Sequence, residues 1–299
     1  MGQSINWAPT TTSLHQIHHD LSGRYGEWPH PRIQATPIRE EQRRRARLDW
    51  SNRVRATYVS AMHAASLHHQ LLTLGAPLDV LSGAAYVSQE LTQHLTATTH
   101  LLRPLQSETA LEVPHHASMT LNEAVSWEGV FEHYVEFFGF NIALSIPLYD
   151  ALAAVSSDKA IAQLSDALSK SLGELQTYGT SALQWMHSTL PERLTAPVIS
   201  QLPGLLANYE RLCDGGPEVL DELAGKEIVV ETRPGNLGTL QSDHCAAIFY
   251  DTLNTSIFPL LDGFGWQSSQ AWQRHYEHSD TTTSSSAVIM ALGLLDPAS

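Results

Sequence analysis

The stretch RATYVSAMHAASLHHQLLTLGAPLDVLSGAAYVSQELTQHL, residues 55–95, decides the predicted fold. Apolar and small residues recur in it every three or four positions, which is the spacing of one buried helix face. Gly75 can take the left-handed conformation that ends a helix, and Ala76-Pro77 follows as a turn. The sequence therefore predicts two antiparallel helices, which span about 37–74 and 78–106 when the pattern is followed outward.

Two more long helices follow downstream. Thr120–Glu123 has the sequence of a capping box and predicts a third helix over 121–155, with a kink at Pro147. Asp158 ends a Ser-Ser-Asp sequence that caps a fourth helix over 158–188. Long helices joined by short loops favour antiparallel neighbours, so we expect an all-α fold built on an antiparallel four-helix bundle.

The pattern divides the chain into three parts. Residues 1–36 are polar and predict an irregular N-terminal arm, and residues 37–190 contain the bundle. Residues 191–299 predict extra C-terminal helices that pack on the bundle, with a short strand or extended linker at 226–231. The expected helices of this last part span 192–213, 217–224 and 240–262.

Charge and composition exclude several functions. The formal net charge is −14, whereas nucleic-acid binding needs a basic patch. The basic cluster within residues 43–47 follows two glutamates and is typical of a solvated helix face. We therefore expect no nucleic-acid partner. The pairs Asp243-His244 and His275–His278 have no third partner nearby in the sequence, so we expect them to lie on the surface.

The sequence also indicates the compartment. No apolar run approaches the about 20 residues that span a membrane, and the N-terminus lacks the features of a signal peptide. Two cysteines, Cys213 and Cys245, imply no disulfide framework. We therefore expect a cytoplasmic protein without a membrane partner.

Helical projection gives the side chains that point inward. The third helix carries the aromatic stripe Trp127, Phe131, Tyr134, Phe138, which Asn141 continues. An asparagine among aromatic residues needs hydrogen-bond partners. Polar residues also lie on or beside the stripes of the other three helices: Thr57, His68, Glu90, His94, Glu174 and Tyr178.

Each of these polar residues has a functional and an ordinary interpretation. His68 and His94 fit either acid–base groups or histidines at a core boundary. The carboxylates at 90 and 174 fit either catalytic groups or a solvated edge. Glu136 lies in a stretch that is apolar almost all round, and burial there would raise its pKa unless it is paired.

The hairpin of residues 55–95 resembles the first helical hairpin of a ferritin-like family found in bacteria, especially myxobacteria. That family has a long helix ending in LGAP and a second helix with a D-E-x-x-H motif. VEFFGFNIAL, residues 135–144, resembles its third-helix E-G-C-x-G-E-T pattern, and residues 164–186 resemble its fourth helix, which has a second E-x-x-H. The resemblance covers about 55–190.

The resemblance implies a two-metal site, usually of iron, from carboxylates and Glu-x-x-His pairs. Here the first- and third-helix glutamates fall on Thr57 and Asn141, and the second-helix Glu falls on Leu91, although its histidine is kept as His94. On the fourth helix, either Glu174 is kept with Thr177 in place of histidine, or Leu175 and Tyr178 occupy the two positions. Thr, Asn and Leu do not supply the donors that a divalent metal needs.

Three functional hypotheses follow from these residues. The favoured one is a metal-independent enzyme that works on a small-molecule substrate in the bundle core by cyclisation, isomerisation or dehydration. Its expected acid–base residues are His94, Glu90, Glu174, Tyr178 and Glu136. Its expected substrate-binding residues are Thr57, His68, Asn141, Phe138 and Tyr134. The family analogy suggests a substrate from bacterial natural-product biosynthesis.

The favoured hypothesis needs no cofactor. The second hypothesis is an iron- or manganese-dependent oxidase or oxygenase whose shifted ligands are Glu90, His94 and Glu136. The third is a non-catalytic bundle that binds a ligand or a partner protein. The sequence leaves a homodimer open.

Overall fold

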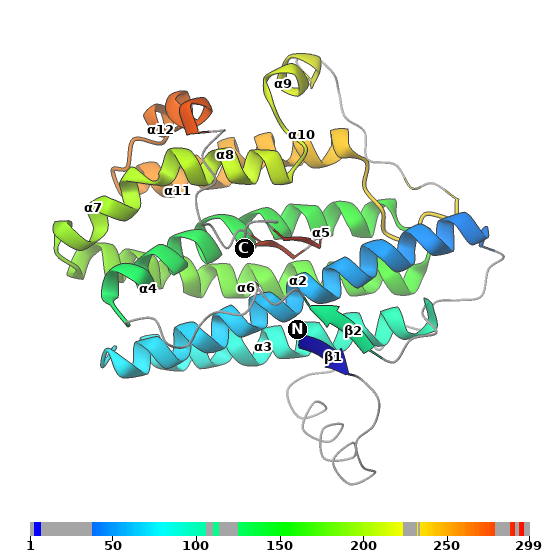
Figure 1. Cartoon of the computed structure of the whole chain (residues 1–299), viewed down its shortest axis with the longest axis horizontal. Helices are drawn as coiled ribbons and strands as arrows, with labels where there is room; N and C mark the ends of the chain where they lie inside the picture. The colour runs from blue at the N-terminus through cyan, green and yellow to red at the C-terminus, as the bar shows by residue number, and fades with distance from the viewer. Residues whose placement is uncertain are drawn as a thin grey trace, which may run out of the picture.

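The part of the chain that the structure describes is mostly helical, which confirms the all-α prediction. Long helices lie side by side along the molecule, and shorter helices cover one side of them (Figure 1). The computed structural model describes residues 3–6, 38–105, 110–113, 125–223, 232, 234–278, 288–290 and 293–295.

The first hairpin forms where the sequence predicts it. Helix α2 spans Glu40–Thr73, and α3 spans Leu78–Leu102. Gly75 takes φ +69°, and the Ala76 N–H donates back to the carbonyl of Leu71 at 3.0 Å. This glycine turn provides hydrogen-bond donors for the carbonyl groups at the end of α2 and reverses the chain. The two helices therefore pack along their length.

The third long segment is one continuous helical rod in three parts. These are α4 (Trp127–Tyr134), the π-helix η3 (Val135–Ile142) and α5 (Ala143–Val155), which contains Pro147. The predicted start at residue 121 is wrong, because residues 125 and 126 are not helical. The Ser126 hydroxyl instead caps the rod by accepting from the Gly129 N–H at 3.1 Å.

Helix α6 spans Lys159–Thr189 and follows α5 after a short turn. The Asp158 carboxylate caps it, because Oδ1 accepts from the N–H groups of Ala160 and Ile161 at 2.9 and 3.2 Å. This cap confirms the prediction from the Ser-Ser-Asp sequence. Helix α6 contacts α5, η3, α3 and α4, so it packs against both the third rod and the first hairpin.

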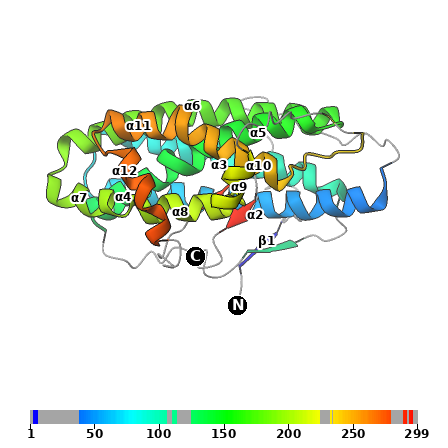
Figure 2. The same cartoon turned by 90° about the horizontal axis from the view of Figure 1, so that it is seen from above.

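The C-terminal part forms a second layer. Helix α7 contacts α4, and α10 contacts α5. Figure 2 looks onto this layer from above. Its elements are α7 (Glu192–Ser200), α8 (Leu202–Leu212), α9 (Pro217–Leu223), α10 (Ser242–Thr252), the π-helix η4 (Leu253–Ile257), α11 (Phe258–Gly263), α12 (Ser268–Arg274) and the 3₁₀ helix η5 (His275–His278). The three predicted C-terminal helical segments are confirmed, while the division of the chain into domains stays a prediction.

Two small β-ribbons accompany the helices. Strand β1 (Gln3–Asn6) pairs antiparallel with β2 (Ala110–Val113), and β3 (Val288–Ile289) pairs with β4 (Leu294–Leu295). The first pairing corrects the prediction of an irregular arm at residues 3–6, because a contact between segments so far apart has no local signal. The predicted strand at 226–231 lies outside the described residues.

The rod Trp127–Val155 is the one helix, in the described part of the chain, that is long and apolar enough to cross a membrane. Most of its apolar stretch is buried inside the protein, as in a helix at the centre of a folded core. The expectation of no membrane partner stays a prediction.

Candidate functional site

A polar chain of three side chains joins α3 to α6. Glu90 and His94 lie one turn apart on α3, and Ser171 faces both from α6. The Ser171 hydroxyl donates to Oε2 of Glu90 at 3.1 Å, and its oxygen lies 2.9 Å from Nε2 of His94. We call Glu90, Ser171 and His94 the relay. The projection placed His94 on the flank of the buried stripe and Glu90 further out, but packing against α6 buries both, to 1 % and 6 % exposed.

The hydrogen bonds of the relay allow two arrangements of its protons, which differ in whether Glu90 is ionised. A serine hydroxyl has one hydrogen, and Ser171 gives it to Glu90 when that carboxylate is ionised. Nε2 of His94 must then carry a hydrogen and donate it to Ser171. When Glu90 is protonated, both hydrogen bonds can reverse, and Nε2 becomes the acceptor. Reversing both bonds moves one hydrogen from Nε2 to Ser171 and one from Ser171 to Glu90, and a neutral His94 then carries its hydrogen on Nδ1.

Burial shifts the pKa of both end groups in opposite directions. It raises the pKa of Glu90, to which the charge of Glu174 adds, while the hydrogen bond from Ser171 works against the rise. Burial lowers the pKa of His94 to about 3. At neutral pH, His94 is therefore uncharged. Glu90 is the relay group whose pKa is shifted from its ordinary value toward neutral pH, which suits proton transfer.

Glu174 and Tyr86 form the outer edge of this site. The Tyr86 hydroxyl donates to Oε2 of Glu174 at 3.2 Å, and Glu174 is exposed on α6. Burial and the charges of Glu90 and Glu174 raise the pKa of Tyr86 to about 12. Glu174 thus acts on Glu90 through its charge, and Tyr86 and Glu174 are exposed neighbours of the buried relay.

Tyr178 belongs to a different set of contacts. Its hydroxyl donates to the carbonyl of Val80 at 2.8 Å and accepts from the Tyr134 hydroxyl, also at 2.8 Å. Phe138 packs edge-on against the Tyr178 ring. Burial raises the pKa of Tyr178 to about 12. These contacts join α6, α3 and α4, so the predicted acid–base role of Tyr178 beside Glu174 has no support in the geometry.

Asn141 is bonded to its neighbours. Its Nδ2 donates to the Ser60 hydroxyl at 3.5 Å, and its Oδ1 accepts from the Ser145 hydroxyl at 3.4 Å. Thr57 is buried on α2, where it acts to lower the pKa of Tyr149 while burial raises that pKa to about 12. Both residues are buried polar groups, as the sequence indicates.

His68 and Glu136 lie outside the relay. His68 is half-buried on α2. The backbone carbonyl of Glu136 accepts from the Tyr209 hydroxyl at 3.4 Å, which places Glu136 at the contact between η3 and α8. No group of three or more His, Cys, Asp or Glu side chains that could hold a metal ion occurs among the residues that the structure describes. The predicted ligand set Glu90, His94 and Glu136 is therefore not assembled.

Sequence reasoning missed the polar residues Ser171, Glu210 and Tyr250, and it wrongly placed two histidines at the surface. One is His244 of the Asp243-His244 pair, which is only 8 % exposed because α10 packs on α5. Ser171 carries no signal of its own, because serine is common on helices. The pair His275–His278 was expected at the surface, but His275 is fully buried and its Nε2 lies 3.0 Å from Oε2 of Glu210. Oε1 of Glu210 accepts from the Tyr250 hydroxyl at 2.7 Å. These contacts tie η5 and α10 to α8, so this buried set holds the second layer together.

No protein-family model matches this chain, and neither a curated protein nor a solved structure matches it.

Proposed function

We propose that this protein is a helical-bundle enzyme that transfers protons to and from a small organic substrate, without a metal, in a cyclisation, isomerisation or dehydration. The observation that carries the proposal is the relay, a continuous hydrogen-bonded path from the edge of α3 and α6 to the buried His94. The proposal includes descent from a ferritin-like bundle. In this view His94 keeps the histidine position of the second-helix E-x-x-H motif, and Leu91 has replaced the glutamate of that motif.

The pKa values assign the roles within the relay. A histidine with a pKa of about 3 is a poor general base near neutral pH, because it binds a proton too weakly. Glu90, whose pKa is raised, is better matched to proton transfer and is the proposed general acid and base. His94 and Ser171 are positioning residues that orient Glu90 through the relay hydrogen bonds.

The surroundings of Glu90 agree with this role. Tyr86 is 41 % exposed and Glu174 is exposed, so this edge is the proposed route of a substrate to Glu90. The two residues offer a hydroxyl and a carboxylate that can orient polar groups of the substrate. The long apolar helices behind the relay exclude water from the His94 end.

The experiment uses proton exchange, because it requires no knowledge of the complete reaction. Purified protein in D₂O is incubated with a panel of small ketones, hydroxyketones and hydroxy acids, and loss of C–H signals is followed by NMR. We expect enzyme-dependent exchange in at least one compound. Glu90→Gln should reduce the exchange rate by about 10² or more.

Ser171→Ala and Ser181→Ala form a matched pair on α6. The Ser181 hydroxyl donates only to the Thr177 carbonyl of its own helix in the described contacts. Loss of Ser171 removes the hydrogen bond that lowers the pKa of Glu90, so the pH profile of exchange should move to higher pH. Ser181→Ala should leave the profile unchanged. An unchanged profile in Ser171→Ala, or full activity in Glu90→Gln, would show that the proposal is wrong.

A further inference from the structure

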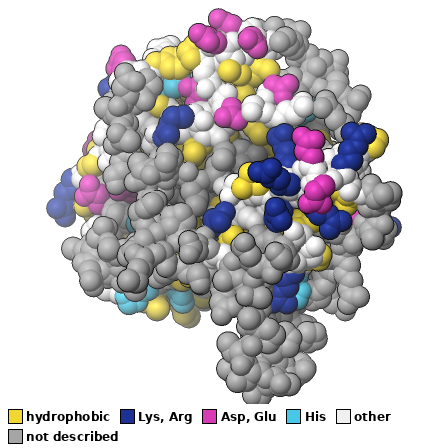
Figure 3. Space-filling view, turned by 45° about the vertical axis from the view of Figure 1, so that its right-hand side comes forward, with side chains coloured by type: hydrophobic (Ala, Val, Ile, Leu, Met, Phe, Trp, Pro, Cys, Tyr) yellow, Lys and Arg dark blue, Asp and Glu magenta, His cyan; other side chains and the backbone are white. Residues whose placement is uncertain are grey.

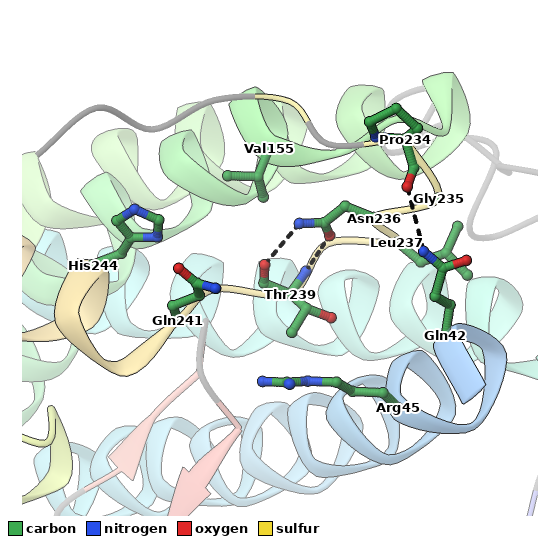
Figure 4. A pocket seen from close by; sticks show the side chains of 10 residues that line it. All are labelled: Gln42, Arg45, Val155, Pro234, Gly235, Asn236, Leu237, Thr239, Gln241 and His244. Atoms are coloured by element: carbon green, nitrogen blue, oxygen red, sulfur yellow. Dashed lines mark hydrogen bonds between the residues drawn. The ribbon is translucent and has the colours of Figure 1, made fainter. Parts of the chain in front are cut away.

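A cavity of about 200 Å³ lies between α2, the end of α5 and the segment that leads into α10. None of the three relay residues lines it. Figure 4 shows the side chains around it. Its polar lining includes Gln42 and Arg45 of α2, Asn236 and Gln241 of the 234–241 segment, and His244 of α10. A ligand in this cavity would bind whether or not the relay carries out the proposed proton transfer.

The wall of the cavity is held in place before any ligand binds. The Asn236 side chain closes its own turn, since Oδ1 accepts from the Thr239 N–H at 2.8 Å and Nδ2 donates to the Thr239 carbonyl at 3.0 Å. The Asn236 carbonyl accepts from the Ser157 N–H at 2.9 Å. Trp50 donates its indole N–H to the Leu237 carbonyl at 2.9 Å. A rigid wall lowers the entropic cost of binding.

Two basic side chains line this cavity without a partner among the described residues. His244 is 8 % exposed, and its buried Nδ1 has no hydrogen-bond partner there. The exposed Arg45 likewise has no acidic partner in the described ion pairs, and Figure 4 shows its guanidinium extended toward the Gln241 side of the cavity. A buried polar atom that lacks a partner costs free energy, which a ligand atom can recover.

The charge of the lining differs from that of the chain as a whole. The chain has a formal net charge of −14, yet the cavity lining has two basic side chains and no acidic one. Figure 3 shows basic side chains gathered on this side of the molecule, with acidic ones among them. Helix α10 also begins beside the cavity at Ser242, and its N-cap Gln241 makes no side-chain cap. The positive end of a helix favours an anion.

We propose that this cavity binds a small organic carboxylate. The planar guanidinium of Arg45 matches the two oxygens of a carboxylate, and Nδ1 of His244 supplies a buried hydrogen bond to the ligand. The Gln241 amide suits a hydroxyl or carbonyl group on the rest of the molecule, while the Gln42 amide donates to the Pro234 carbonyl at 3.3 Å and adds to the fixed wall. The size of the cavity suits an organic acid rather than a macromolecule.

The test uses isothermal titration calorimetry on the full chain at constant ionic strength, set with chloride. The probes are malonate, succinate and citrate, with inorganic phosphate and the neutral malonamide as comparisons. We expect at least one carboxylate to bind with a Kd below about 1 mM, and malonamide to show no saturation. Arg45→Gln and His244→Gln should each weaken the carboxylate by at least tenfold.

Arg47→Gln is the matched control, because Arg47 is also exposed on α2 but does not line the cavity. It should bind like the unchanged protein. The proposal is overturned if none of the three carboxylates saturates, if phosphate alone binds, or if Arg45→Gln and Arg47→Gln have equal affinities. Proton NMR spectra of all three variants verify that they are folded.

Discussion

At the scale of single residues, burial decides how the polar groups behave. His94 and Glu90 have the same i, i+4 spacing as many exposed pairs, yet both are buried because α6 packs over them. Burial favours the neutral form of each group, which lowers the pKa of His94 and raises that of Glu90. On an isolated helix, the side chains of Glu90 and His94 would be solvated. Burial against α6 gives them the pKa shifts that suit proton transfer.

The lowered pKa of His94 predicts a loss of stability in acid. The unfolded chain binds a proton at His94 near pH 6.5, whereas the folded protein does so only near pH 3. Between these values the unfolded state binds more protons, so stability is complete above about pH 6.5 and falls as the pH is lowered toward 3. The contribution is on the order of a few kcal/mol.

The measurement is urea unfolding of His94→Gln and of the unchanged protein from pH 7 to pH 4. We expect the free energy of unfolding to fall less steeply in the variant. Some slope should remain, because burial and the charge of His133 lower the pKa of the half-buried His63 to about 4. The exposed His69 provides the control His69→Gln, which should keep the full slope. Equal slopes in all three proteins would contradict the assignment.

At the scale of elements, glycines allow the central helices to approach closely. The Phe138 ring of η3 packs directly over Gly179 of α6, and the Tyr178 ring packs over Gly83 of α3. A Cβ atom at either glycine would overlap the ring. The aromatic stripe of the third helix was predicted, but the glycines opposite it carry no sequence signal, because glycine in a helix by itself only lowers helix propensity.

Two glycines of α6 give a test with an internal control. Gly173 has open space around its Cβ position, whereas Gly179 meets Phe138. Gly173→Ala should stabilise the protein by roughly 0.5–1 kcal/mol, because alanine costs less backbone entropy in a helix. Gly179→Ala should destabilise it by roughly 1–3 kcal/mol, because the core has no room for the methyl group.

Thermal and urea unfolding of the two variants measure this difference. Opposite signs are the expected result. If both alanines stabilise the protein to the same extent, Phe138 does not pack on Gly179 as described.

At the scale of the whole molecule, the two layers are tied together by a few buried hydrogen bonds. Trp50 of α2 is fully buried and donates to the Leu237 carbonyl, which lies nearly two hundred residues later in the chain. The Tyr209 hydroxyl of α8 donates to the Glu136 carbonyl of η3 and likewise joins the two layers. The Trp50 contact connects the long helices to the segment that forms the wall of the cavity.

Trp50→Phe should loosen this connection. Phenylalanine keeps a ring but leaves the Leu237 carbonyl without its donor, which costs about 1–3 kcal/mol. Hydrogen exchange of residues 234–241 should become faster, and the free energy of unfolding should fall. Trp185→Phe is the control, since Trp185 is partly exposed and packs edge-on against Trp127. If both variants exchange alike over 234–241, the Trp50 contact does not hold the segment.

By itself, the sequence determined the local structure. The LGAP turn, the Asp158 cap and the helical spacing of apolar residues gave the helices within a few positions, because capping and amphipathic periodicity are local properties. The start of the third helix was the exception, since Thr120–Glu123 and Ser126 both resemble caps and only packing selects between them.

The tertiary structure alone decided which polar residues meet. Ser171 joins Glu90 to His94 from a different helix, and His275 reaches Glu210 across 65 positions of sequence. Tyr178, expected beside Glu174, instead bonds Tyr134 and Val80. A helix pattern gives the face on which a side chain lies, but the partner on that face depends on the register and rotation of the neighbouring helix. Those are set by packing of the whole core, and no local stretch of sequence contains them.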